Sequence, residues 1–389
     1  MVTAIRTYVV HTHNVHMYNG QQREDMAGQY AARRRTRSVG RSIVTIIAEL
    51  LLTFAAICGL YVAWMQWWTG VESDHVQQET RAQVAWAQPN DGGTLHIAQP
   101  QSGEPPVQPE SAPVGELIAR VYIPRFGDQW ERNLVQGTSL TELNKHGLGH
   151  YVDSQMAGQV GNFAMAGHRN GYGQPLGDVD TLEQGDAIVI RSKDYWYVYQ
   201  YTNHTIVTPN EGWVIGPNPE HPEEAPTKRL ITMTTCEPKY TAPTHRWISF
   251  GEFKYWAKVT DGIPQELAKT GANGAVEFIN NERQPFASSI GSLAPWVWGA
   301  LAVYAAIFLA AAIAWRWPAL RAIREGSKPL PDADIYGWLL RHQPGAAPIR
   351  WLLLLLLVFA AAAALFQWGF PWAAANIPFL QQMSNYVAV

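Results

Sequence analysis

Cysteine is scarce in this chain, which contains only Cys58 and Cys236 among its 389 residues. Cys58 lies in a long apolar run and Cys236 lies in a polar region, so the two are not expected to pair. A disulfide-stabilised fold is therefore excluded, and Cys236 is predicted to be a free thiol. If the region around it faces an oxidising space outside the cell, a free thiol there needs a functional reason.

An excess of charge of either sign is also missing, since the formal net charge is only -3. A nucleic-acid-binding domain normally carries a basic patch or stripe, so we predict no nucleic-acid partner. The histidines of the N-terminal tail are spaced too irregularly to predict a metal site. We predict no cofactor and no metal ligands.

Long apolar runs are present, at residues 43–68, 294–315 and 351–370. Each is long enough to cross a bilayer, which takes about 20 residues. Arginine and lysine gather in the tail 1–42 and in the loop 316–350, which predicts that both are cytoplasmic. The first run is too long for a cleaved signal peptide, so we expect an uncleaved anchor. Residues 371–389 are then an extracellular tail.

The region between the first two runs is expected to lie outside the membrane and to have three parts. Residues 69–114 are rich in Gln, Pro, Ala and Gly and predict a flexible stalk. Residues 115–260 predict a mostly β domain, and 261–293 a linker. The pattern lacks the alternation of strands and helices of a doubly wound sheet, which favours a mostly antiparallel barrel with short helices. The clearest expected strands are 117–124, 161–167, 187–191, 195–201, 230–236 and 246–253.

The stretch LITMTTCEPKYTAPTHRWISFGEF, residues 230–253, places a thiol and a guanidinium at facing ends of two strands. A thiol needs a base or a positive field to become a nucleophilic thiolate. Arg246 can supply the field. The segment GNFAMAGHRNGYG supplies His168 as the base, directly after a strand of small residues.

Together, the run TMTTC ending at Cys236, the AGHRNGYG segment with His168, and Arg246 ten residues after the cysteine resemble the sortases, transpeptidases of Gram-positive cell walls. The resemblance covers residues 117–259 and implies a closed antiparallel β-barrel. It also implies that Cys236 forms a thioacyl enzyme, that His168 transfers protons, and that Arg246 stabilises the oxyanion with help from the backbone N–H of Glu237.

The resemblance further implies cleavage after Thr in a sorting motif of LAxTG or LPxTG type, and transfer to an amine. The partners would be sorting-signal proteins and an amine of a peptidoglycan precursor or a pilin. Features around His168 resemble class E, the housekeeping enzymes of actinobacteria, whereas CEPKYTAPTHR and the C-terminal membrane helices are closer to class C; we favour class E. The substrate-binding candidates are Thr234, Thr235, Tyr172, Trp213 and Ile215.

The linker contains a sequence of the same LAxTG form. Leu267, Ala268, Lys269, Thr270 and Gly271 spell LAKTG, and an apolar run followed by Arg316 comes after them, as in a sorting signal. One hypothesis is that LAKTG is a pseudosubstrate or self-processing site. The other is that the match is coincidental.

Several alternatives stay open at this point. His150 and His245 are competing bases, Arg246 could be a structural ion-pair partner, and Cys236 could be a small core residue. An L,D-transpeptidase also uses an extracellular cysteine and histidine, but typically within a Ser-His-Gly-Cys motif that is absent here. A non-catalytic membrane scaffold or receptor would leave the thiol idle.

Overall fold

The computed structural model describes residues 39–89, 94–271, 274–280, 290–329 and 331–384. By its internal contacts the chain divides into two compact units, one of residues 1–59 and 295–363 and the other of residues 60–294 and 364–389. Residues 1–38 of the predicted cytoplasmic tail 1–42 lie outside the described residues. The second unit contains the β domain and the whole site discussed below.

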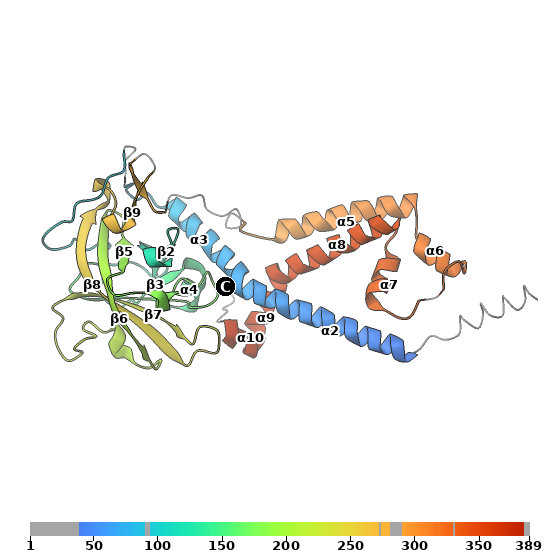
Figure 1. The fold of residues 1–389 in the computed structure, drawn as a ribbon, viewed down its shortest axis with the longest axis horizontal. Helices are drawn as coiled ribbons and strands as arrows, with labels where there is room; N and C mark the ends of the chain where they lie inside the picture. The colour runs from blue at the N-terminus through green and yellow to red at the C-terminus, as the bar shows by residue number, and fades with distance from the viewer. Residues whose placement is uncertain (1–38, 90–93, 272–273, 281–289, 330, 385–389) are drawn as a thin grey trace, which may run out of the picture. The chain divides into compact units, whose positions relative to one another are not determined.

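The β domain is a closed barrel of eight strands in the order β1-β2-β3-β4-β7-β8-β6-β5 (Figure 1). Most neighbours are antiparallel, but β2 pairs with β3 and β4 pairs with β7 in parallel. The predicted closed barrel is confirmed, with these two parallel pairs as a refinement. The strands are β1 (Leu117–Tyr122), β2 (Glu131–Gln136), β3 (Leu148–His150), β4 (Gly161–Gly167), β5 (Ala187–Arg191), β6 (Tyr195–Val207), β7 (Arg229–Glu237) and β8 (His245–Lys258).

Alternation of side chains between two faces builds the barrel core. In β6, Tyr197, Tyr199 and Tyr201 point into one cluster, where they meet Ile231 and Met233 of β7. Their neighbours on β6, such as Trp196 and Val198, join a second cluster on the outer face. The strand is therefore buried on both faces over its first half, which explains its run of aromatic and β-branched residues.

Short helices connect the strands. Helix α4 (Leu140–His146) begins after Ser139, whose hydroxyl oxygen accepts the N–H of Thr141 at 3.3 Å, as the capping pattern with Glu142 predicts. Short 3₁₀ helices also occur between or after the strands, at Pro124–Phe126, Val179–Thr181, Gly212–Ile215, Val259–Asp261 and Gln265–Leu267.

Parts of the segment expected to be a flexible stalk are folded: among its described residues, 69–89 and 94–114, helix α3 (Thr69–Gln83) is present and Ala98 is hydrogen-bonded to Ile263. Helix α2 (Val39–Ala63) continues through a π-helical turn, Trp64–Trp68, into α3, so that residues 39–83 form one helical stretch. Farther along, the backbone N–H of Ala98 donates to the carbonyl of Ile263 at 2.8 Å. The backbone N–H of Gln101 likewise donates to the carbonyl of Trp256 at 2.9 Å, so this part of the segment lies along the barrel.

The linker before the second apolar run is also partly folded. Strands β9 (Ala268–Thr270) and β10 (Val276–Phe278) form a two-stranded antiparallel sheet that packs on the outer cluster of the barrel. Beyond the third run, α9 (Phe370–Asn376) and α10 (Pro378–Ser384) belong to the barrel unit, where Phe370 packs with Trp64 and Trp68.

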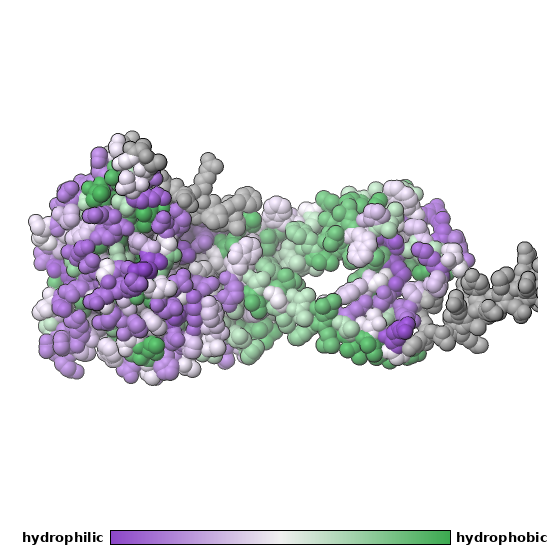
Figure 2. All heavy atoms as spheres, viewed as in Figure 1, coloured by the Kyte–Doolittle hydropathy of each residue, from purple (hydrophilic) through white to green (hydrophobic). Residues whose placement is uncertain are grey.

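The other unit contains the apolar helices. They are the first part of α2, α5 (Ala294–Ala314), α6 (Pro318–Arg324), α7 (Ile335–His342) and α8 (Ala347–Ala364). Glu49 of α2, a costly residue inside an apolar run, accepts the N–H of Ile335 at the start of α7 at 2.5 Å. Three helical stretches in the described residues, 39–83, 294–314 and 347–376, are long and apolar enough to cross a membrane. In Figure 2 the surfaces of α5 and α8 are mostly hydrophobic, whereas the barrel surface is mostly hydrophilic.

Candidate active site

The thiol, the imidazole and the guanidinium lie at the ends of three neighbouring strands. Residue pairing between β7 and β8 places Cys236 directly opposite Arg246, and directly opposite residues share one face of a sheet. Pairing between the parallel strands β4 and β7 places Ala166 opposite Thr234, so two residues further on His168 and Cys236 follow at the same edge. The hydroxyl of Thr235 donates to the carbonyl of Gly167 at 2.8 Å and ties the two strand ends together.

His168 and Cys236 line one small pocket. Its lining includes Met65, His168, Arg169, Cys236, Lys239 and Met383. Cys236 is a half-buried free thiol. Arg246 is half-buried as well, but its Nη1 donates to the carbonyl of His245 at 3.1 Å, and it is not among the residues that line the pocket. The structure thus brings the thiol and imidazole together and leaves the guanidinium beside them on β8.

The imidazole of His168 is enclosed. It is 4% exposed, its Nε2 lies 2.7 Å from Oδ1 of Asn144, and its ring centroid lies 4.8 Å from that of Tyr172. Burial lowers the pKa of His168 to about 4, so the ring is neutral at neutral pH. Because Oδ1 of Asn144 accepts, the proton is assigned to Nε2, which leaves Nδ1 as the basic nitrogen.

Asn144 and Arg169 are contributions to the site that sequence reasoning missed. Asn144 lies on α4, far from His168 in sequence, and only the capping pattern at Ser139 indicates that a helix is there. Arg169 stands beside His168 and donates through Nη1 to the carboxylate of Glu237, the residue beside Cys236, in a close ion pair. Adjacency to both reactive residues was a signal that could have identified this pair.

Arg169 is held on its other sides too. Its guanidinium carbon lies 4.9 Å from the centre of the Trp247 ring, and Nη2 lies 3.3 Å from Oδ1 of Asp180. The arginine is only 5% exposed. Because it is anchored to β7 through Glu237 and to β8 through Trp247, it fixes the backbone next to His168 against both strands.

The competing histidines are placed elsewhere. His150 is fully buried on β3, with Nδ1 2.8 Å from Oε1 of Gln136 and its ring against Phe163. His245 pairs with Glu237, one residue out of step with Cys236, so its side chain points to the opposite face of β8. Neither shares the pocket of the thiol.

The two threonines before the cysteine have different surroundings. Thr234 lies on the face of Cys236, where its Oγ1 is 2.9 Å from the hydroxyl of Tyr151. Thr235 points to the other face and makes the bond to Gly167 described above. Tyr172 stacks on His168.

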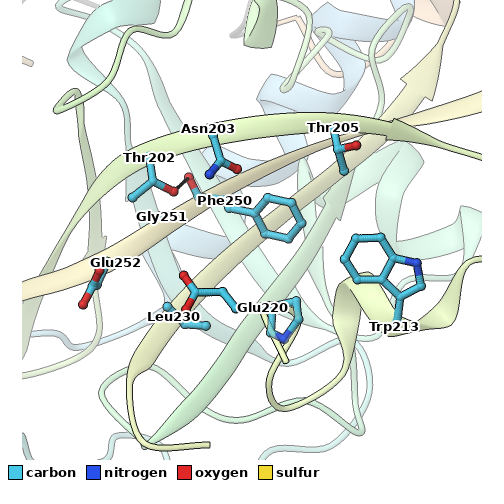
Figure 3. A pocket seen from close by; sticks show the side chains of 10 residues that line it. Thr202, Asn203, Thr205, Trp213, Glu220, Leu230, Phe250, Gly251 and Glu252 are labelled. Carbon is cyan, nitrogen blue, oxygen red and sulfur yellow. Dashed lines mark hydrogen bonds between the residues drawn. The ribbon is translucent and has the colours of Figure 1, made fainter. Parts of the chain in front are cut away.

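A second, larger pocket contains Trp213 of the loop between β6 and β7 (Figure 3). Its volume is about 230 Å³. The Trp213 ring lies parallel to Phe250 at 6.5 Å, while Ile215 is half-buried in the same 3₁₀ turn. Its lining residues are Thr202, Asn203, Thr205, Trp213, Pro219, Glu220, Leu230, Phe250, Gly251 and Glu252.

The LAKTG sequence lies on the outer surface of the barrel. Leu267 is fully buried in the outer cluster, and Ala268 to Thr270 form strand β9. The threonine of the motif is paired with Val276 of β10. The motif is therefore held in a paired β-hairpin and is not free to enter the pocket of Cys236 as a single strand.

Comparisons with known proteins agree with the geometry. A family model described as the sortase domain matches residues 121–254. Sortase SrtE2 of Streptomyces coelicolor is 32% identical over 248 residues, which cover 60% of this chain and 92% of that protein. The chain belongs to the sortase family. Sortases are cysteine transpeptidases, so the L,D-transpeptidase and scaffold alternatives fall away.

Other relatives carry the same class name. Sortase SrtE1 of Streptomyces coelicolor is 30% identical over 250 residues, which cover 61% of this chain and 64% of that protein. The solved structure of sortase E from Streptomyces avermitilis is 36% identical, with a TM-score of 0.37, and the match covers 40% of this chain and 99% of that one. The resemblance to class E is confirmed by the two relatives from Streptomyces coelicolor.

Proposed function

We propose that this sortase is membrane-anchored, cleaves a sorting motif of LAxTG or LPxTG type after Thr, and transfers the new acyl group to an amine of the cell wall. One observation carries the proposal. A free thiol and a neutral imidazole end two neighbouring parallel strands and line a single pocket. A cysteine nucleophile with an adjacent base is the arrangement that thioacyl chemistry requires.

In the proposed mechanism the proton of the Cys236 thiol moves to Nδ1 of His168 as the sulfur attacks the carbonyl carbon of Thr. The C–N bond to Gly then breaks, and the imidazolium gives its proton to the departing amine. An incoming amine then attacks the thioester and loses a proton to His168; the C–S bond breaks, and the imidazolium returns the proton to the sulfur to restore the thiol. The burial that keeps His168 neutral at rest makes it ready to accept the first proton.

The tetrahedral oxyanion needs fixed donors in this scheme. Arg246, opposite Cys236, and the backbone N–H of Glu237 are the proposed donors. The guanidinium would exchange the carbonyl of His245 for the substrate oxyanion. That carbonyl belongs to His245, the exposed first residue of β8, where water can replace the guanidinium as a partner.

The larger pocket of Figure 3 is the proposed site for the apolar first residue of the motif. Phe250 pairs with Thr232, four residues along β7 from Cys236, and opposite residues share a face. Four strand residues span about 13 Å. An extended peptide covers about 10 to 13 Å from Leu to the Thr carbonyl. Trp213 and Ile215 are then proposed to contact the substrate, with Thr234 along its path.

The proposed orientation has residues 1–42 and 316–350 in the cytoplasm and the barrel outside, as the distribution of arginine and lysine favours. A peptidoglycan precursor is the proposed amine acceptor. A pilin amine is the second candidate, because CEPKYTAPTHR and the C-terminal helices resemble class C.

The test uses the full chain in detergent with one LAxTG and one LPxTG peptide, each with and without an added amine. Mass spectrometry should find a product cut after Thr that becomes an amide when the amine is present. Cys236→Ala should abolish both products, and Cys58→Ala, which removes the chain's other thiol, should keep them. Products that persist in Cys236→Ala would refute the proposal.

A further inference from the structure

The helical stretch of residues 39–83 passes against the loop that follows His168, and the contact is made where α3 begins. Thr69, at the start of α3, is 2% exposed, and its Oγ1 accepts the backbone N–H of Tyr172 at 2.9 Å. The same hydroxyl donates to the carbonyl of Met65 at 2.7 Å. Its hydrogen is therefore committed within the helix, which leaves an oxygen lone pair to hold the loop.

The backbone of the helix and that of the loop lie so close together that glycine is needed on both sides. A Cβ on Gly70 would lie 2.9 Å from the backbone nitrogen of Gly173, and a Cβ on Gly171 would lie 3.3 Å from the carbonyl oxygen of Met65. Arg132 of β2 bridges the two, since its Nη2 donates to the carbonyl of Gly173 at 3.3 Å and its Nη1 lies 4.0 Å from Oδ1 of Asp74 on α3. Helix and loop thus form one packed unit.

The conformation of Tyr172 makes this contact necessary. Its φ of 51° lies in the left-handed region, which a residue with a large side chain rarely adopts unless its surroundings impose it. In that conformation the ring stacks on the imidazole of His168, with the planes inclined by 32°. The hydrogen bond from the N–H of Tyr172 to Thr69 holds the backbone of Tyr172, whose ring covers His168.

We infer that Thr69 is a positioning residue for the transpeptidation reaction: through Tyr172 it holds the imidazole of His168 in its enclosed position beside Cys236. The helix that continues the first apolar run is therefore a functional part of the active site and not only a tether. The inference rests on the proposed roles of His168 and Cys236.

The chain offers a matched control on the same helix. The hydroxyl of Thr80 donates to the carbonyl of Val76, four residues earlier, at 2.8 Å, as that of Thr69 does to Met65. Thr69→Val and Thr80→Val each remove a hydroxyl bond to the carbonyl four residues earlier in the helical stretch of residues 39–83. Only Thr69→Val also removes the acceptor for Tyr172, and Thr69→Ser restores it.

The first experiment measures peptide cleavage by the full chain in detergent micelles, with an LAxTG peptide as the probe. We expect kcat of Thr69→Val to fall about 10-fold with little change in KM, because a reacting group is displaced while peptide contacts remain. Thr69→Ser and Thr80→Val should match the wild type. Equal kcat in Thr69→Val and Thr80→Val would overturn the inference.

The second experiment needs no substrate and therefore separates this inference from the proposed function. Alkylation of Cys236 by iodoacetamide, followed by mass spectrometry, is measured against pH. Without the Tyr172 cover, water reaches His168 and its pKa rises toward its ordinary value, so an imidazolium favours the thiolate at lower pH. The other charged groups in the pocket are Arg169 and Lys239, with Arg246 on the adjoining strand, and all are unchanged in these variants.

We expect the alkylation profile of Thr69→Val to shift to lower pH, and those of Thr69→Ser and Thr80→Val to stay in place. Gly70→Ala should act like Thr69→Val, because its new methyl pushes the loop away, and it replaces Thr69→Val if that variant does not fold. Identical profiles in all variants would contradict the positioning role, even if the wild type failed to cleave the peptide.

Discussion

Two enclosed histidines, His168 and His150, lie in different surroundings within the same barrel. Both rings are buried against an aromatic neighbour, and burial lowers the pKa of both. His150 has partners on both nitrogens, since Nδ1 meets Gln136 while Nε2 lies 3.0 Å from the carbonyl of Gln155. His168 has Asn144 on Nε2, and among the described residues its Nδ1 has no hydrogen-bond partner.

The comparison teaches that burial and a lowered pKa do not by themselves identify a catalytic histidine. A ring whose two nitrogens are bound by the protein can only hold the fold together. A ring with one nitrogen anchored and the other unbound, in a pocket that it shares with a thiol, can exchange a proton without losing its orientation. The two histidines therefore differ in whether one ring nitrogen is left without a hydrogen bond to the protein, and this difference can be tested by mutation.

The largest expected effect comes from replacing each histidine by glutamine. His168→Gln should lower kcat by about 10² to 10⁴, the range lost with a general acid–base group. His150→Gln should keep much of the activity of the folded enzyme but lower its free energy of unfolding by about 1 to 3 kcal/mol, since buried partners lose their hydrogen bonds. Peptide cleavage gives kcat and thermal unfolding gives the stability of both variants. Equal losses of kcat would show that the two histidines do not differ in function.

A smaller effect is expected at the ion pair between Arg169 and Glu237, which has no counterpart at His150. Glu237→Gln leaves the buried guanidinium without its nearest carboxylate, so the strand ends that carry His168 and Cys236 should loosen. We expect kcat to fall roughly 10- to 100-fold through misplacement of the reacting groups.

Asp180→Asn is the matched control for that ion pair. Asp180 contacts the same arginine, but its side chain is 51% exposed, so its contribution is weakened by solvent. Its kcat should stay within about 2-fold of the wild type. If Glu237→Gln and Asp180→Asn had the same activity, the pair would not position the site.

The lowered pKa of His168 also predicts how stability depends on pH. The folded protein binds a proton at this site only near pH 4, whereas the unfolded chain binds one at the ordinary value of 6.5. Between these values the unfolded state holds more protons, so the stabilisation is complete above 6.5 and is lost as pH falls toward 4.

Between pH 7 and pH 4, His168→Gln should lose less free energy of unfolding than the wild type, by on the order of 1 to 3 kcal/mol. Unfolding by denaturant at several pH values provides the measurement. Because burial also lowers the pKa of His150, part of the slope should survive in the variant. A slope unchanged by His168→Gln would mean that this ring is not protected from protonation.

The sequence predicts the parts of this site that follow from strand patterns and fails where contacts join distant polar segments. The barrel, the strand that ends at Cys236 and the base at His168 were all predicted. Thr69, Ser73 and Gln77 form a polar stripe at helical spacing, and each is at most 2% exposed. Such residues look like a solvated linker, because their buried hydrogen bonds to the loop and to β2 have no signature in the local sequence.

The same reason explains the other omissions. The parallel pairing of β4 with β7 spans two intervening strands, so nothing local to either strand encodes it. Asn144 became a partner of His168 only because α4 folds against β3. Sequence patterns identify the reactive groups, whereas the groups that orient them come from long-range topology.

The smallest expected effect concerns LAKTG, where a recognisable pattern again has enclosed surroundings. With Leu267 buried and Thr270 paired in β9, the motif must leave the barrel surface before Cys236 could cleave it. We therefore expect the intact mass of the wild type, and that of Cys236→Ala, each to stay unchanged over hours.

Leu267→Ser should open the hairpin by removing a buried side chain, at a cost of about 2 to 4 kcal/mol of local stability. Cleavage after Thr270 that appears in Leu267→Ser but not in Leu267→Ser with Cys236→Ala would identify LAKTG as a concealed substrate, whereas an unbroken chain in both would make the match coincidental.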